Sequence, residues 1–203
     1  EAQVHALRPS TAYKSGAMDL TQGLHRISLD QPLAPGESLG LDFELEYANE
    51  GFKNQEGAAS LAFNGNGSFF NNSLLPSLGY NAQRELADDR VRRKHDLAPK
   101  ERMPDLDDPQ GRMANLTGDS NWIGFEATVS TSADQIALAP GYLQREWTEN
   151  GRRYFHYKMD RPILNFYAFL SARYAVKRDR WNDVAIEIYY HPGHEYNLDR
   201  MVA

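Results

Sequence analysis

Residues 123–130 read Ile-Gly-Phe-Glu-Ala-Thr-Val-Ser, so that apolar side chains alternate with small or polar ones. In an extended strand, successive side chains point to opposite faces, and the apolar set then shares one face. As a helix, the same residues would scatter acidic and apolar groups all around the surface. The pattern therefore predicts a β-strand with one buried face and one face in water.

The same period-two pattern recurs along the chain, at residues 39–47, 155–159, 164–176 and 184–190. Turn sequences separate these stretches, and Asn150-Gly151, between Trp147 and Tyr154, is typical of a hairpin tip. Clean alternation indicates antiparallel sheets, whereas parallel strands read as continuous apolar runs. We therefore predict an all-β fold, an antiparallel β-sandwich of about eight to ten strands.

The middle of the chain has a different character. Residues 83–95 favour a helix but contain few apolar side chains, and they precede a polar stretch with three prolines. We predict a short surface helix at 83–95, within one long irregular excursion that spans residues 81–120.

Composition excludes several classes of protein. The 203 residues include 22 basic and 28 acidic side chains, a formal charge of −6, which argues against a nucleic-acid partner. No run approaches the ~18 apolar residues of a membrane span, so we expect no direct membrane insertion of this part. The absence of cysteine excludes thiol catalysis, iron–sulfur clusters, cysteine zinc sites and disulfides.

Two strings contain residue types that bind metal ions. In His191-Pro192-Gly193-His194-Glu195, two imidazoles and a carboxylate are close in sequence, and a small metalloenzyme built on His191, His194 and Glu195 is one hypothesis. The intervening Pro-Gly favours a surface turn instead. Asp105, Asp107 and Asp108 contain oxygen ligands suited to calcium, but they lack the glycine and distal glutamate of a calcium loop, and we favour turn caps.

Two further strings have structural interpretations. Residues 64–68 are glycine-rich but lack the lysine of a phosphate-binding loop, so we favour a turn between strands. The basic cluster at residues 90–94 follows two aspartates, which is typical of a solvated helix with favourable end charges. The sequence has no G-x-S-x-G and no HExxH. We assign no catalytic, cofactor-binding or metal-binding residue to this chain.

Six strings occur in an order that resembles a known family: Leu33–Ser38, Asn64–Phe69, Leu75–Tyr80, Arg102–Pro109, Phe125–Thr131 and Ile136–Leu143. Over about residues 20–195, the chain resembles the N-terminal β-domain of the aminopeptidase N-like (gluzincin) zinc metallopeptidases. In that family a β-sandwich, the saddle domain, precedes a thermolysin-like catalytic domain. Two of the strings, Leu75–Tyr80 and the start of Arg102–Pro109, suggest the bacterial type in which the module follows the membrane helices of an ABC-type transporter permease.

The resemblance implies a non-catalytic module that docks on a downstream catalytic domain of the same chain and walls its cleft. It implies residues 1–19 as a lead-in, 20–195 as the β-sandwich domain and 196–203 as the start of a connection to a further domain. Zinc would belong to the catalytic domain alone. The module would be the water-soluble, extracytoplasmic part of a bacterial inner-membrane protein, although the sequence does not fix the side of the membrane.

The chain also departs from the family pattern. The zinc-binding HExxH and the Gly-x-Met-Glu-Asn string belong to the next domain and are absent here, so neither zinc nor proteolysis is assigned. The family's amine-holding residue would come from residues 64–80, where Asn71, Asn72 and Tyr80 are candidates, but none is assigned. Asp105 or a neighbour replaces the usual cysteine of the Pro-Cys-x-Asp string.

An alternative hypothesis belongs to another class of protein. An autonomous module could bind a glycan or a protein through exposed aromatic side chains. Tyr154, Tyr167 and Tyr189 would serve this purpose if they lay along one sheet face.

Overall fold

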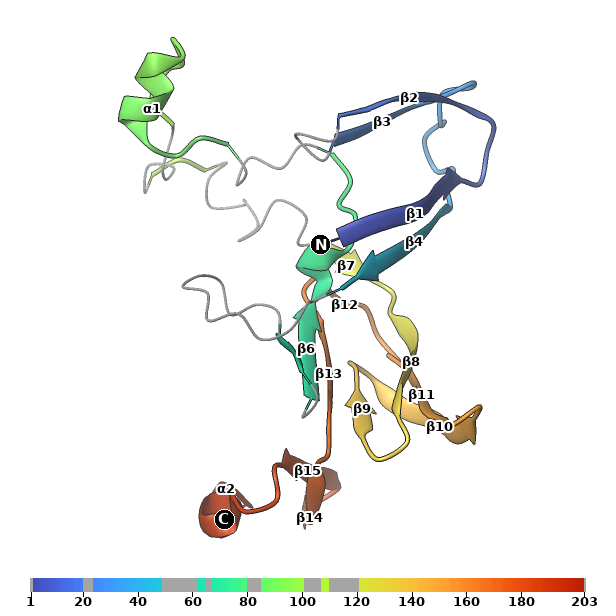
Figure 1. Ribbon diagram of the computed structural model, residues 1–203, viewed down its shortest axis with the longest axis vertical. Coiled ribbons are helices and arrows are strands. Elements are labelled where there is room, and N and C mark those ends of the chain that lie inside the picture. Colours follow the sequence, from blue (N-terminus) through green and yellow to red (C-terminus); the bar gives the residue numbers. More distant parts are fainter. Residues whose placement is uncertain are drawn as a thin grey trace. The chain divides into compact units, whose positions relative to one another are not determined.

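The computed structural model describes residues 2–19, 24–48, 62–64, 67–79, 85–100, 107–109 and 121–202 (Figure 1). The chain divides into two compact units, residues 1–53 and 54–203. Strands dominate both, and every strand pairing in the described ranges is antiparallel, which confirms the all-β prediction. No helix in these ranges is long and apolar enough to cross a membrane.

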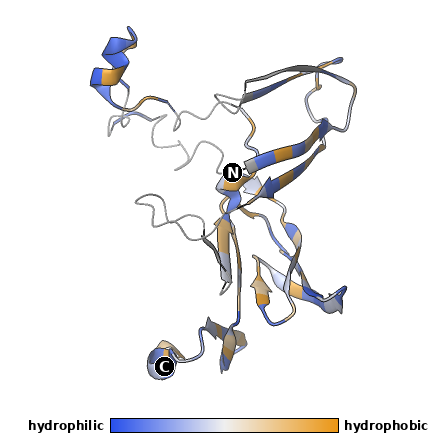
Figure 2. Cartoon of the chain, in the orientation of Figure 1, coloured by the Kyte–Doolittle hydropathy of each residue, from blue (hydrophilic) through white to orange (hydrophobic). Residues whose placement is uncertain are grey.

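The first unit contains two strand pairs. Strand β1 (Ala2–Pro9) pairs with β4 (Leu41–Tyr47), and β2 (Tyr13–Asp19) pairs with β3 (Leu24–Leu29). Figure 2 shows the alternating hydropathy along β1 and β4. The predicted strand 39–47 is present from Leu41 onward. The pairing of β1 with β4 shifts register between Val4 and Ala6.

The second unit contains the remaining strands: β5 (Ala62–Asn64), β6 (Gly67–Asn71), β7 (Trp122–Ile123), β8 (Glu126–Ser132), β9 (Ile136–Leu138), β10 (Tyr142–Glu149), β11 (Arg152–Lys158), β12 (Ile163–Leu164), β13 (Ala168–Ala172), β14 (Ala175–Trp181) and β15 (Val184–Tyr190). They form a three-stranded sheet β10-β11-β8, a four-stranded sheet β5-β6-β13-β9, and the two-stranded ribbons β12-β7 and β14-β15. The helices are α1 (Asp89–Lys94), α2 (Leu198–Val202) and two 3-10 turns, Asn72–Leu74 and Glu195–Asn197.

The core lies where the two larger sheets meet. Phe155 and Tyr157 from β11 pack with Ala137 of β9, and their exposed fractions are 2%, 6% and 0%. The Tyr157 hydroxyl donates a hydrogen bond of 2.8 Å to the Ala137 carbonyl. Because burial disfavours the phenolate, the pKa of Tyr157 rises to about 12, and the donor hydrogen stays in place at neutral pH.

Two predicted strands differ from the observed ones. The stretch 123–130 forms β7 and β8, separated at Gly124 and Phe125, although the inward side of β8 carries Ala127 and Val129 as predicted. The prediction of one strand over 164–176 is wrong. The chain changes partner twice there, since β12 pairs with β7, β13 lies between β6 and β9, and β14 pairs with β15. The described ranges contain fifteen strands, more than the predicted eight to ten, and these breaks account for three of them.

The predicted hairpin at residues 150–151 is confirmed. Asn150 and Gly151 have φ angles of 49° and 74°, the two positive values that a type I′ turn requires. The turn sets the register that places Trp147 opposite Tyr154, whose rings stack with centroids 5.0 Å apart.

The predicted surface helix is present but shorter than 83–95. Helix α1 begins at Asp89 because the Asp88 carboxylate accepts hydrogen bonds from the backbone N–H groups of Arg90 and Val91. Its acidic start and basic end agree with the expected end charges. Residues 83–84 and most of the excursion at 81–120 lie outside the described residues. The predicted domain boundaries at residues 19 and 195 stay predictions.

Two turn glycines offer a matched test of the fold. At Gly141 (φ 104°) an added Cβ would lie 2.6 Å from the Lys158 carbonyl carbon, whereas at Gly151 (φ 74°) it would meet nothing within 4 Å. We expect Gly141→Ala to lower the free energy of unfolding by at least about 2 kcal/mol and Gly151→Ala by about 1 kcal/mol. Urea unfolding measures both. Equal losses would show that β10 does not approach β11 as closely as described.

Candidate functional site

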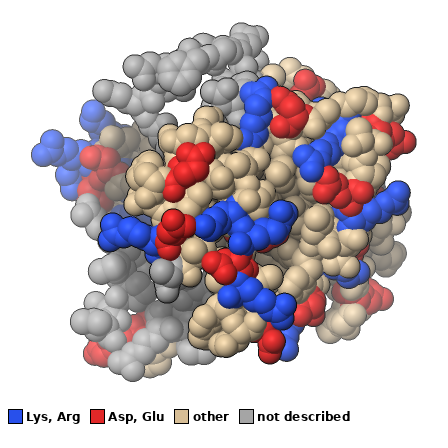
Figure 3. Space-filling model, turned by 90° about the horizontal axis from the view of Figure 1, so that it is seen from below, with Lys and Arg blue, Asp and Glu red and all other residues tan. Residues whose placement is uncertain are grey.

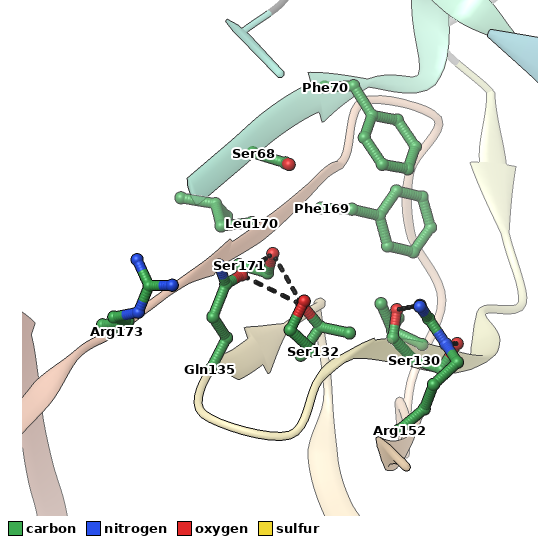
Figure 4. Close-up of a pocket in the computed structure, with 12 residues that line it drawn as sticks. Ser68, Phe70, Ser130, Ser132, Gln135, Arg152, Phe169, Leu170, Ser171 and Arg173 are labelled. Carbon is green, nitrogen blue, oxygen red and sulfur yellow. Dashed lines mark hydrogen bonds between the residues drawn. The ribbon is translucent and has the colours of Figure 1, made fainter. Parts of the chain in front are cut away.

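A cavity of about 330 Å³ opens beside the core of the second unit (Figure 4). It lies between β8 of the three-stranded sheet and strands β6 and β13 of the four-stranded sheet. Its lining includes Ser68, Phe70, Thr131, Gln135, Phe169 and Ser171. The cavity therefore has both an apolar and a polar wall.

Three side-chain oxygen atoms meet on the polar wall. Thr131 Oγ1 lies 3.0 Å from Gln135 Oε1 and 3.1 Å from Ser171 Oγ, and Ser171 Oγ lies 2.9 Å from Gln135 Oε1. Thr131 and Gln135 are each only 6% exposed. We call these three side chains the oxygen cluster.

The apolar wall consists of stacked aromatic rings. Phe70 and Phe169 come from the paired strands β6 and β13 at directly opposed positions, and their ring centroids are 5.0 Å apart. Phe169 also packs against Phe125, which is buried. The wall is thus fixed by the sheet register.

Two arginines border the cavity on opposite sides of the oxygen cluster (Figure 4). Arg152 donates from Nε to Ser130 Oγ at 3.1 Å and from Nη2 to the Ser130 carbonyl at 2.9 Å. Arg152 takes part in none of the ion pairs within the described ranges. Arg173 forms an ion pair with Asp134 and lowers the pKa of that carboxyl. The two guanidinium groups therefore differ, since only Arg173 has a carboxylate partner within the described part of the chain.

The outer face of the three-stranded sheet carries a second cluster of titratable groups. The Glu126 carboxylate lies 2.9 Å from Lys158 Nζ and 2.8 Å from His156 Nε2. The hydrogen bond from Lys158, followed by that from His156, lowers the pKa of Glu126. No hydroxyl of a described residue bonds to His156, so the geometry supplies an ion-pair network and no activated nucleophile.

Charge elsewhere in the second unit is also mixed. Arg178 pairs with Glu187 at 2.8 Å and Lys177 with Asp199 at 2.7 Å. Figure 3 shows basic and acidic side chains interspersed on the face in view.

The histidine string forms a turn after β15. The rings of His191 and His194 are 5.5 Å apart, but the Glu195 carboxylate accepts a hydrogen bond from the Gly193 N–H, which lowers the pKa of Glu195. His191 Nδ1 bonds to the Pro192 carbonyl oxygen. Within the described ranges, no group of three His, Asp or Glu side chains is placed to hold a metal ion.

Two other candidate strings are described only in part. Asp107 lies in a turn with Asp108 beside it, and Asp105 lies outside the described residues. In the glycine-rich string at 64–68, Asn64 of β5 lies opposite Gly67 of β6, and residues 65–66 lie outside the described residues.

The candidate amide side chains have structural partners. Asn71 accepts from the Ser73 N–H and caps a 3-10 turn, and the Asn72 side chain donates to the Asn165 carbonyl at 2.8 Å. Tyr80 lies outside the described residues.

The three tyrosines of the binding hypothesis do not share a sheet face. Tyr154 stacks on Trp147, Tyr167 packs against Phe125 and Phe169, and Tyr189 packs against Tyr174. Tyr154 and Tyr189 belong to different sheets, and Tyr167 precedes β13. A platform built from these three rings is therefore excluded.

The sequence patterns do not predict the oxygen cluster. Its members come from β8, the turn before β9, and β13, and Ser171 is 36 positions from Gln135. No linear motif joins them. The available signals were a polar threonine at an inward position of β8 and a serine within an apolar strand.

Comparisons with known proteins give no assignment. No family model matches the chain, and neither the curated proteins nor the solved structures contain a match.

The Glu126 cluster gives a pH-dependent prediction. Because the pKa of Glu126 is lower in the folded chain, its ionised form stabilises the fold above its ordinary pKa of 4.5, and this contribution is lost as the pH falls through the lower, folded value. We expect Glu126→Gln to reduce the free energy of unfolding at pH 7 and to match the parent chain near the acid end, in urea titrations from pH 7 to about 3. Glu149→Gln, which removes a carboxylate from β10 of the same sheet, is the control. A constant deficit at all pH values would contradict the proposed ion-pair origin.

Proposed function

We propose that this chain is a non-catalytic β-module that docks on a catalytic domain of the aminopeptidase N-like zinc metallopeptidase class and forms one wall of its cleft. The family assignment has its support in the order of the six sequence strings. Two of them fall within the central part of the second unit. Phe125–Thr131 forms most of β8. Ile136–Leu143 contains β9, the Pro140-Gly141 turn and the start of β10.

An exposed apolar cluster carries the proposal of a docking function. Trp122 of β7 lies directly opposite Leu164 of β12, and the Phe166 N–H bonds to the Leu164 carbonyl. Trp122 and Phe166 are each 72% exposed and Leu164 is 47% exposed. We call these three side chains the apolar cluster. Adjacent exposed apolar groups of this size are typical of protein interfaces, where aromatic side chains contribute much of the binding energy.

The occupant is a folded domain with an apolar patch of its own. The apolar cluster contains no charged residue, and a two-stranded ribbon is stable only when it packs against something larger. In this proposal the cluster packs on the catalytic domain. The module supplies a wall, while zinc and the reacting groups belong to the partner domain.

The first test concerns chemistry. Because the chain lacks HExxH, we expect no hydrolysis of aminoacyl-anilides by the purified chain with added zinc. The measurement is release of the chromogenic amine over a buffer blank. Hydrolysis that persists after a second purification and co-elutes with the chain would contradict a non-catalytic role.

The second test concerns docking. The parental reading frame is expressed beyond residue 203, and hydrogen exchange of residues 122–123 and 163–164 is compared with that of the isolated chain. We expect slower exchange in the longer protein, and we expect Trp122→Ser to abolish most of the slowing. Trp181→Ser is the matched control, because Trp181 is 68% exposed on the separate β14-β15 ribbon. A reading frame without a zinc-peptidase domain, or equal exchange in both proteins, would refute the proposal.

A further inference from the structure

The oxygen cluster contains too few hydrogens for its own contacts. Three oxygen–oxygen distances of 2.9–3.1 Å join Thr131, Gln135 and Ser171. The two hydroxyls supply one hydrogen each, and a carboxamide oxygen supplies none. At most two of the three contacts can be hydrogen bonds at once. The third contact then has no hydrogen between its two oxygen atoms, and their free lone pairs can accept from an outside N–H or O–H donor.

Burial keeps these lone pairs away from bulk water. Thr131 and Gln135 are each only 6% exposed, and the cavity borders the cluster directly. A ligand in the cavity could donate a hydrogen bond from a hydroxyl group to one of these oxygen atoms.

The cavity also presents a positive charge to its occupant. The Arg152 guanidinium is oriented by its two hydrogen bonds to Ser130 and has no carboxylate partner within the described ranges. Guanidinium groups held in this way favour carboxylate or phosphate oxygens. The neighbouring hydroxyls and amide suit a ligand with several hydroxyl groups.

The remaining wall selects for a ring. Phe70 and Phe169 present stacked aromatic surface to the same cavity, which suits the apolar C–H face of a sugar. A volume of about 330 Å³ lies at the lower end of ligand pockets and suits one sugar ring with its substituents.

We propose that this cavity binds a sugar acid, a monosaccharide whose carboxylate pairs with Arg152 and whose hydroxyl group donates to the oxygen cluster of Thr131, Gln135 and Ser171. The proposal does not rest on docking to a peptidase domain, because the apolar cluster and the cavity share no residue.

The test uses the complete 203-residue chain and two sugar acids, D-glucuronate and D-galacturonate, with D-glucose as the neutral probe. Binding is followed by NMR shifts of cavity resonances up to about 20 mM ligand, a range that detects millimolar affinity. We expect saturable shifts with at least one acid and affinity for glucose at least about tenfold weaker, because glucose lacks the charge-assisted bond.

Three variants separate the cavity from general charge effects. Arg152→Gln is expected to weaken binding of the acid about tenfold, to the level of glucose, and Ser171→Ala is expected to weaken binding of both probes. Arg145→Gln is the matched control, because Arg145 lies over Trp147 and does not line the cavity. Thermal melting confirms that each variant is folded.

The outcomes decide between the proposal and its alternatives. No shift with either acid, or equal weakening by Arg152→Gln and Arg145→Gln, would overturn it. Side-chain amide hydrogens of Gln135 that bond to Thr131 and Ser171 in the free chain would also overturn it, because a reversed amide closes the cluster without a ligand. Saturable binding that requires Arg152 and Ser171 would support it.

Discussion

The contact between β11 and β9 holds the second unit together. Phe155 and Tyr157 cover Ala137, and the buried Tyr157 hydroxyl donates to the Ala137 carbonyl across the two sheets. Each sheet alone would expose an apolar face, so neither is stable without the other. A buried carbonyl without a donor would cost about as much as a lost hydrogen bond. The Tyr157 hydroxyl therefore favours the one arrangement of the two sheets in which it reaches the Ala137 carbonyl.

This packing also explains where the cavity lies. Strand β8 belongs to one sheet and β9 to the other, and the short turn between them carries the chain from sheet to sheet. Thr131 and Gln135 lie on either side of that turn, and Ser171 lies opposite Ala137 in the neighbouring strand. Three polar side chains therefore meet at the corner where the chain crosses between the sheets.

Local patterns were sufficient to predict the fold class and several elements. The alternation in β8 and β11 and the Asn150-Gly151 turn depend on neighbours in sequence, and the structure agrees with each. The division of residues 164–176 into three strands depends on which other strand pairs with each segment. The bulge in β1 depends in the same way on its pairing with β4. Neither could be predicted from the spacing of apolar residues along the chain. The oxygen cluster was unpredictable for the same reason, since it joins three elements that are distant in sequence.

The apolar cluster and the cavity are made of different residues. The cavity wall is fixed from behind by aromatic packing, since the Phe125 ring contacts Tyr167 at 4.8 Å and Phe169 at 6.2 Å between centroids, and Phe169 lines the cavity. Trp122, Leu164 and Phe166 line no part of the cavity. The two proposals therefore rest on separate parts of the second unit, and each can fail without the other.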